Sequence, residues 1–294
     1  MSKYSNLEIL GVGKQPGGRF GKVLIAGSGT IFGDVECDRF ELPGAGKIEN
    51  GGLLVHGPAE IDGAGSVEGS VRAEGLEING SFKAHQACEV TGNLEVNGSL
   101  KVEGPCLVGG DADICGSLKT TGGLTVRDLD VTGAVSVDGR LQAERVEVDG
   151  VLKVNGEVQA EEFKADGTVT IEGLLNAETV ELSVAGEDLI ESIGGASIKV
   201  RRGKGWFFSF ARKRPHLISN LIEADEINLE YTDCQVVRGI NVHIGPECVI
   251  DRVEYSGTLT TDAYATIREK VKVEPGPSRS GRALPEPEES LNSL

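Results

Sequence analysis

The residue types that most often carry chemistry are few in this chain of 294 residues. None of its four histidines stands at the spacing of a catalytic triad or of a metal-ligand motif. The six cysteines form no Cys-x-x-Cys pair, which argues against a zinc ribbon and is typical of a reducing compartment. No glycine is followed by the Lys-Ser/Thr pair of a phosphate-binding loop. The sequence therefore predicts no catalytic residue, no metal site and no cofactor.

One segment has a surface chemistry of its own. Between Ser192 and Ile222 there is no acidic residue, although the whole chain has a net charge of −17. The same segment holds the single tryptophan and three of the phenylalanines. The candidate residues for contact with a membrane or a partner are Arg201, Arg202, Lys204, Trp206, Phe207, Phe208, Phe210, Arg212, Lys213 and Arg214.

Two interpretations of this basic and aromatic segment compete. We expect Ser197–Arg202 and Trp206–Phe210 to form a β-hairpin that projects from the body of the protein. In the first interpretation its aromatic rings pack on that body and its cations pair with acidic groups there. In the second the rings insert at the headgroup level of a membrane and the cations meet anionic lipid. Nucleic acid or a protein partner is a third reading of this segment, whereas the acidic net charge of the whole chain argues against nucleic acid as a general partner.

Most of the chain is organised by a glycine that returns every 17 or 18 residues, at Gly63, Gly80, Gly98, Gly116, Gly133, Gly150 and Gly167. Apolar residues recur two and four positions later, as in Leu152 and Val154, then Val169 and Ile171. This alternation predicts strands, and each unit holds three short strands with a turn between them. We expect the glycines to supply positive φ angles at the corners.

Such units must stack, because a coil this small cannot bury its own apolar face whereas stacked coils share one core. The sequence therefore predicts an all-β parallel β-helix of about twelve coils, nearly 60 Å long at roughly 4.8 Å per strand. The carboxylates that alternate with the apolar residues should form its solvated outer face. Cys88 and Cys106 stand at the same offset from Gly80 and Gly98, so we expect them on adjacent coils.

A second signature, apolar-x-Ala-acid-x-apolar-x-apolar, begins at Leu175 and again at Ile222. These residues are 47 positions apart (222 − 175), where one coil takes 17 or 18. The difference predicts an insertion of about 30 residues between neighbouring coils.

The expected organisation is a single β-helix with two tails. The helix occupies residues 23–183 and 221–273, and the inserted basic and aromatic hairpin or loop occupies residues 184–220. Residues 1–22 are rich in glycine and lack periodicity, which predicts a flexible N-terminal tail. Residues 274–294 carry four prolines and predict a disordered tail.

The expected location of the protein is the cytoplasm. The sequence has no apolar run long enough to span a bilayer and no secretory signal at its N-terminus. Under the membrane interpretation of the basic segment, the protein lies at the inner face of the cell membrane.

An enzymatic alternative is the hexapeptide-repeat acyltransferase, a left-handed β-helix with coils of about 18 residues. Its repeats place glycine directly after the inward aliphatic residue, whereas here glycine follows two positions later, as in Val131-Thr132-Gly133. Only the stretch from Val242 to Ile250 fits the hexapeptide pattern. A monomeric β-helical adaptor is the other alternative.

Units such as Val135–Glu144 and Leu152–Glu161, of the form Val-x-Val-x-Gly-x-Leu-x-Ala-Glu, resemble bactofilins, the bacterial polymer-forming cytoskeletal proteins. The resemblance covers roughly residues 23–273. It implies a right-handed, three-sided β-helix that assembles end to end, without nucleotide, into filaments that support cell-envelope, shape or motility machinery. This rod would be a longer form than usual, with the basic segment as an addition.

The ends of the predicted rod are candidates for the contact between subunits. A terminal coil has N–H and C=O groups without a neighbour, and the sequence shows no amphipathic helix of capping length. Both ends are expected to be apolar and extended. The candidate interface residues are Ile25, Ile31, Phe32, Val253, Tyr255, Leu259, Tyr264 and Ile267.

Overall fold

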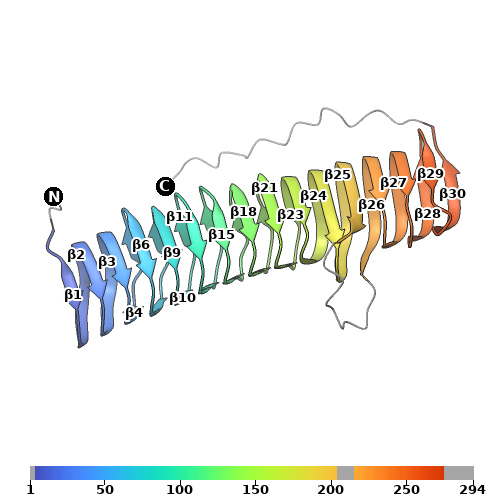
Figure 1. Ribbon diagram of the computed structural model, residues 1–294. Coiled ribbons are helices and arrows are strands. Elements are labelled where there is room, and N and C mark those ends of the chain that lie inside the picture. The colour runs from blue at the N-terminus through green and yellow to red at the C-terminus, as the bar shows by residue number, and fades with distance from the viewer. Residues whose placement is uncertain (1–3, 204–214, 275–294) are drawn as a thin grey trace, which may run out of the picture.

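The computed structural model describes residues 4–203 and 215–274, and these residues wind into a straight, three-sided rod of parallel strands (Figure 1). The described part of the chain contains thirty strands in one continuous sheet and no helix. Away from the two ends of the rod, each strand bonds to the strand one coil before it and to the strand one coil after it, always in parallel. The all-β parallel β-helix expected from the sequence is therefore confirmed.

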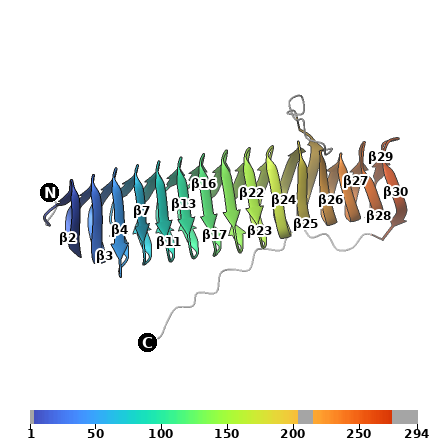
Figure 2. The same cartoon turned by 90° about the horizontal axis from the view of Figure 1, so that it is seen from below.

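Three faces, A, B and C in chain order, make up each coil. In the regular part of the rod each face has one short strand per coil, and in the remainder one long strand passes over two or three faces (Figures 1 and 2). The strands of face A are β4 (Ala45–Glu49), β7 (Ala64–Val67), β10 (Ser81–Ala84), β13 (Ser99–Val102), β16 (Ser117–Thr120), β19 (Ala134–Val137) and β22 (Val151–Val154). Those of face B are β5 (Leu53–Val55), β8 (Val71–Ala73), β11 (Cys88–Val90), β14 (Cys106–Val108), β17 (Leu124–Thr125) and β20 (Leu141–Gln142).

Face C has β1 (Leu7–Ile9), β6 (Pro58–Ile61), β9 (Gly75–Ile78), β12 (Leu94–Val96), β15 (Ala112–Ile114), β18 (Asp128–Val131), β21 (Arg145–Val148) and β29 (Leu259–Thr261). The strands that pass over more than one face are β2 (Val12–Ile25), β3 (Ser28–Leu42), β23 (Val158–Ala165), β24 (Thr168–Val184), β25 (Glu187–Arg202), β26 (His216–Leu229), β27 (Thr232–Ile244), β28 (Val249–Tyr255) and β30 (Thr266–Lys272).

The rod has about 15 coils, more than the sequence predicted. At roughly 4.8 Å per coil it is about 70 Å long. Its core is one unbroken column of inward aliphatic side chains, and the expected inward residues Leu152, Val154, Val169 and Ile171 are at most 1% exposed. Their neighbour Lys153 points outward, which confirms the predicted register.

Cys88 and Cys106 face each other on adjacent coils, as the sequence predicts. Both thiols are fully buried and free. The hydrogen bond with Cys106, followed by burial, raises the pKa of the Cys88 thiol well above its ordinary value. The two thiols therefore behave as small apolar groups in the wall of the core.

The repeating glycines are required because the backbones of neighbouring coils approach each other closely at these corners. The expectation that they supply positive φ angles there is wrong. None of the seven glycines that recur every 17 or 18 residues has a positive φ. Instead, a Cβ on Gly116 would lie 2.0 Å from the carbonyl oxygen of Gly98, one coil earlier. A Cβ on Gly98 would meet the oxygen of Gly80 at 1.9 Å in the same way. The corner stacks backbone directly on backbone, and any side chain would force the coils apart.

The expected flexible tail at residues 1–22 is wrong, because β1 and β2 occupy most of it. β1 pairs with Val23–Ile25, and β2 pairs along nearly its whole length with β3. The glycines that disguise the period are needed for packing. A Cβ on Gly29 would lie 2.8 Å from Cδ1 of Ile9, because large aliphatic side chains of face C fill the space beside it.

The expected insertion at residues 184–220 is mostly another coil. β25 pairs in parallel with β24 on one side and with β26 on the other, with Leu175 opposite Ile193 and Ile193 opposite Ile222. Ser197–Arg202 is therefore the face-C part of a coil and not a hairpin arm. The other predicted hairpin arm, Trp206–Phe210, lies outside the described residues. Residues 1–3 and 275–294 also lie outside them, and the prediction of a disordered C-terminal tail concerns this last segment.

Candidate assembly surfaces

The N-terminal end of the rod is an apolar strand edge. On each face, the first strand segment of the described chain has a neighbour on one side only: β1 on face C, and the first and second parts of β2 on faces A and B. The side chains of Leu10 and Val12 beside this edge are 69% and 93% exposed, and Leu7 and Phe20 are half-buried. Unpaired N–H and C=O groups next to exposed apolar side chains favour contact with another edge.

The sequence placed this end one coil too far along the chain. Ile25 and Ile31 were expected at the interface, but both are fully buried because the coil made by β1 and β2 covers them. Phe32 is 39% exposed, and Nζ of Lys14 lies 5.7 Å from the centre of its ring. Phe32 therefore belongs to the side of the rod near this end.

The C-terminal end is less apolar than expected. Tyr255, Leu259 and Ile267 pack half-buried against the core, Tyr264 is 78% exposed, and Val253 is fully buried under the last coil. In that coil Lys270 and Lys272 stand opposite the inward-facing positions of Val253 and Tyr255. Charged residues at inward positions of an edge strand oppose further pairing. The two ends of the rod therefore differ in kind.

Of the expected basic and aromatic contact residues, the structure describes Arg201 and Arg202. Arg201 donates from Nε to the hydroxyl of Ser183 at 3.0 Å. The Arg202 guanidinium lies 5.6 Å from the centre of the Tyr231 ring, a cation–π distance. The remaining residues of this set lie outside the described chain: Lys204, Trp206, Phe207, Phe208, Phe210, Arg212, Lys213 and Arg214.

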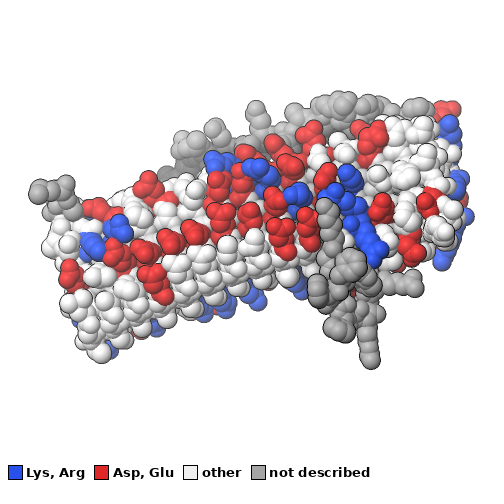
Figure 3. Space-filling view, viewed as in Figure 1, with Lys and Arg blue, Asp and Glu red and all other residues white. Residues whose placement is uncertain are grey.

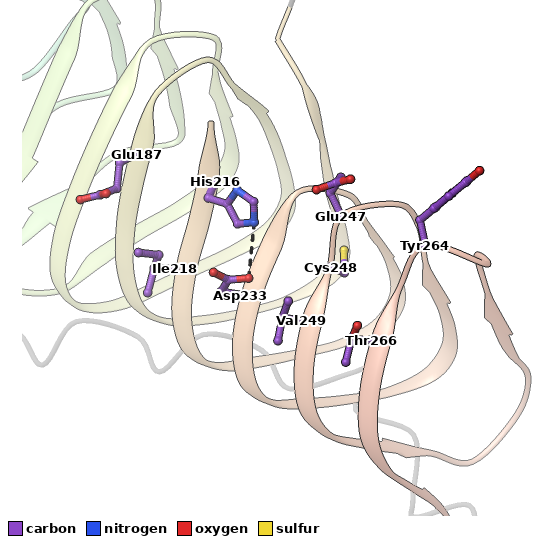
Figure 4. A pocket seen from close by; sticks show the side chains of 9 residues that line it. All are labelled: Glu187, His216, Ile218, Asp233, Glu247, Cys248, Val249, Tyr264 and Thr266. Atoms are coloured by element: carbon purple, nitrogen blue, oxygen red, sulfur yellow. Dashed lines mark ion pairs between the residues drawn. The ribbon is translucent and has the colours of Figure 1, made fainter. Parts of the chain in front are cut away.

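A depression of about 530 Å³ opens on face A near the C-terminal end, lined by side chains from β25 to β30 (Figure 4). Nε2 of His216 lies 3.4 Å from Oδ1 of Asp233, an ion-pair distance when the imidazole is protonated. The same carboxylate oxygen is buried and accepts no hydrogen bond of good geometry from the described residues. Ile218 and Val249 form an exposed apolar floor, which the sequence did not indicate.

The cysteine that lines this depression, Cys248, is not activated as a nucleophile. The Cys248 thiol is buried and donates to the carbonyl of Leu229 at 3.4 Å, and burial raises its pKa to about 12. A thiol held in this way is not a nucleophile near neutral pH. The described residues also contain no group of three or more His, Cys, Asp or Glu side chains that could hold a metal ion, and no helix that is long and apolar enough to cross a membrane.

Face C carries a column of carboxylates that point outward from seven successive coils. The members, paired coil to coil, are Glu41, Glu60, Glu77, Glu95, Asp113, Asp130 and Glu147. Figure 3 looks onto this face and shows Asp and Glu in lengthwise rows. Burial, followed by the charges of Glu147 and Asp113, raises the pKa of Asp130. We refer to these residues as the acidic column.

Face A carries a column of the opposite sign. Lysines and serines point outward at Lys47, Ser66, Lys83, Lys101, Lys119, Ser136 and Lys153. Lys101 and Lys83 both donate to Glu103 at the neighbouring corner, at 2.8 and 2.9 Å. These hydrogen bonds lower the pKa of the Glu103 carboxyl to about 2. We refer to these five lysines as the lysine column. Sequence reasoning treated the outer charges as a mixed solvated face and missed their separation, although the period of 17 or 18 residues encodes it.

Comparisons with known proteins identify two relatives of part of the chain. The chain is 40% identical over 84 residues to the uncharacterized protein YhbF of Bacillus subtilis strain 168, which is 29% of this chain and 34% of the relative. It is 39% identical over 90 residues to the uncharacterized protein YhbE of the same strain, covering 30% of this chain and 38% of the relative. The chain thus matches about a third of the length of each. No family model matches the chain, and no solved structure matches it.

Proposed function

We propose that this protein is a non-enzymatic structural rod that joins end to end into filaments without a nucleotide. The observation that carries the proposal is the N-terminal edge, which is apolar and unpaired in the described chain. Joining two such edges continues the ladder of strands and removes Leu10 and Val12 from water. Burying an aliphatic side chain of this size contributes about 1.5–3 kcal/mol.

The difference between the two ends favours contacts of like with like. Two N-terminal edges are both apolar, whereas contact with a C-terminal edge meets Lys270 and Lys272. A contact between two C-terminal edges brings these lysines together, so it is the weaker joint and is strengthened by salt. Alternating joints of the two kinds produce a filament without polarity.

The filament is proposed to act as a cytoplasmic scaffold at the inner face of the cell membrane. Arg201 and Arg202 stand next to the further basic residues of the 204–214 segment, and such clusters attract anionic lipid. Proteins of cell shape, of the envelope or of motility are the expected partners of such a scaffold. The resemblance of the repeat to bactofilins is the support for this part of the proposal.

Electron microscopy of the purified protein in nucleotide-free buffer tests the proposal. We expect filaments from the wild type, and particles no longer than two rods from the variant Leu10→Asp/Val12→Asp. Leu259→Asp/Ile267→Asp should leave pairs of rods, because the N-terminal joint is intact in that variant. Circular dichroism should show an unchanged β-rich fold in each, because the substituted side chains lie at the ends of the core.

The matched control is Val151→Asp, which places the same charge at an exposed valine in the middle of face A, 48% exposed. This control should form filaments of normal length. A field of single wild-type rods would contradict the proposal and favour a monomeric adaptor. Filaments of normal length from Leu10→Asp/Val12→Asp would show that the N-terminal edge is not the joint.

A further inference from the structure

The acidic column and the lysine column occupy almost the same stretch of the rod on two different faces. The acidic column runs from Glu41 to Glu147 and the lysine column from Lys47 to Lys153. Both advance by one coil, about 4.8 Å, at each step. Face B between them carries no such column, since its outward residues alternate in kind, for example Arg72, Glu89, Leu107 and Thr125.

The middle of the acidic column forms no ion pair within the described chain. Glu77 and Glu95 accept hydrogen bonds from the neutral amides of Asn79 and Asn97, at 2.9 and 2.8 Å. Asp113 and Asp130 continue the column in the next two coils, and no ion pair of the described residues includes either. Toward its ends the column pairs with cations: Glu41 with Lys22 at 2.6 Å, Glu60 with Arg39 at 3.6 Å, and Glu147 with Lys164. Stacked carboxylates without counter-charges repel one another and attract an array of cations.

We propose that face C of one rod docks side by side on face A of a second copy, with the acidic column of the first against the lysine column of the second. The common axial step allows several pairs to form in one register. The side chains of Lys47, Lys101 and Lys153 are 43%, 44% and 48% exposed, so they are accessible from outside. Because every rod presents both faces, the contact repeats and joins more than two rods side by side.

The existing ion pairs of the lysine column do not prevent this contact. Lys153 reaches Glu172 at 3.6 Å, and Lys47 reaches Glu49 and Glu68 at 2.8 and 3.0 Å. These pairs are exposed, and each ammonium has three N–H donors, so one lysine can bridge its corner carboxylate and a carboxylate of the second rod.

Salt should affect this contact in two opposite ways. The net charge of −17 repels two rods at long range, and this repulsion dominates at low ionic strength. At about 0.1 M salt the screening length is about 10 Å, which removes the long-range repulsion and preserves pairs in direct contact. At about 1 M salt the pairs themselves are screened. Side-by-side association should therefore pass through a maximum near 0.1 M salt.

The test uses analytical ultracentrifugation of the full chain, in a background of Leu10→Asp/Val12→Asp/Leu259→Asp/Ile267→Asp, which removes both end contacts so that side contacts are measured alone. The face-C variant carries Glu95→Lys, Asp113→Lys and Asp130→Lys, and the face-A variant carries Lys83→Glu, Lys101→Glu and Lys119→Glu. Each alone should associate at least about tenfold more weakly than the background protein, because like charges then meet. A one-to-one mixture of the two should regain association, because acidic faces again meet basic faces.

A face-B variant, Thr125→Lys/Gln142→Lys/Gln159→Lys, is the control for adding charge and should associate like the background protein. A milder face-C variant, Glu95→Gln/Asp113→Asn/Asp130→Asn, serves if a reversal of charge prevents folding, and it should also weaken association.

Either of two results would overturn the proposal: association of both charge-reversed variants as strong as that of the background protein, or no restoration of association in their mixture. It is also overturned if rods associate only after polylysine is added, which would assign face C to a separate basic protein. Loss of filaments with intact side-by-side association would refute the end joints alone.

Discussion

The coils from Leu94 to Val154 and those from Glu187 to Ile250 share one backbone geometry but differ in what they put inside and outside. In the first region the inward residues are almost all aliphatic, with Thr120 as a buried polar exception, and the outward ones are mostly charged or polar. In the second region Asp188, Ser219 and Thr232 are buried, while hydrophobic side chains such as Ile218 and Val249 are 40% and 43% exposed.

Each polar side chain inside the second region has a backbone partner. Thr232 donates to the carbonyl of Glu230 at 2.9 Å, and Ser219 reaches the carbonyls of Glu191 and Leu221 at 3.3 Å. Asp188 accepts the N–H of Val169 at 2.8 Å. The comparison teaches that a coil tolerates a polar side chain at an inward position, provided that the polar group finds a hydrogen bond.

The largest effect is expected from a charge placed inside the regular region. Val154→Asp puts a carboxylate among fully buried aliphatic side chains, where an unpaired charge costs several kcal/mol. Lys153→Asp, one residue away and pointing outward, should change the free energy of unfolding by about 0.5 kcal/mol or less. Chemical denaturation followed by circular dichroism measures both, and equal stabilities would refute the register.

A buried carboxyl in the second region should make its stability depend on pH. Burial raises the pKa of Asp188 from 3.8 to about 6, while the hydrogen bond from Val169 opposes the shift. The protonated form therefore favours the folded state, and its stabilisation is complete below about pH 4 and is lost as the pH rises through about 6. The loss is about 3 kcal/mol at pH 7.

Asp188→Asn should therefore raise the free energy of unfolding at pH 7 by up to about 3 kcal/mol and have little effect at pH 4. The exposed Asp113→Asn is the matched control and should show no such gain. Equal gains at pH 4 and pH 7 would indicate that the carboxyl of Asp188 is ionised in both conditions or that another group causes the effect.

The smallest difference concerns one corner position in the two regions. Gly116→Ala should destabilise the rod by about 1–3 kcal/mol, because its Cβ would lie 2.0 Å from a backbone oxygen that cannot move away. Gly186→Ala, at the start of the second region, meets only the side-chain oxygen of Thr168 at 3.8 Å. It should be neutral or stabilising by up to about 1 kcal/mol. The difference in melting temperature between the two variants measures it, and similar losses in both would contradict the backbone-stacking account.

The sequence predicted the fold where the repeat was regular. It missed coils in which close packing requires glycine at a position where the repeat pattern has a larger residue. The coil of β25 was hidden because Gly195 stands where the signature has alanine, and a Cβ there would lie 2.3 Å from the carbonyl oxygen of Ala177. The first coil was hidden by Gly13 and Gly29, which make room for Ile9. These substitutions depend on neighbours one coil away, which a pattern along one coil does not include.

The candidate surfaces were predictable to a smaller extent. The sequence indicated that the ends are apolar, but the position of each end depends on how many coils precede it, so Ile25 and Ile31 were misplaced. That Lys270 stands at an inward position is known only from its pairing with Val253 in the structure. The acidic and lysine columns were readable in principle, because residues one repeat apart stack on the same face.

The glycine corners also make the rod a length standard. The junctions Gly98-Ser99 and Gly116-Ser117 are chemically identical, and the strands that follow them, β13 and β16, differ only at Val102 and Thr120. Removal of residues 99–116 joins Gly98 to Ser117 and shortens the rod by one coil, about 4.8 Å, with both ends unchanged. Duplication lengthens it by the same step. The distance between whatever binds at the two ends is therefore set in fixed increments by the number of repeats in the gene, independently of the chemistry of the ends.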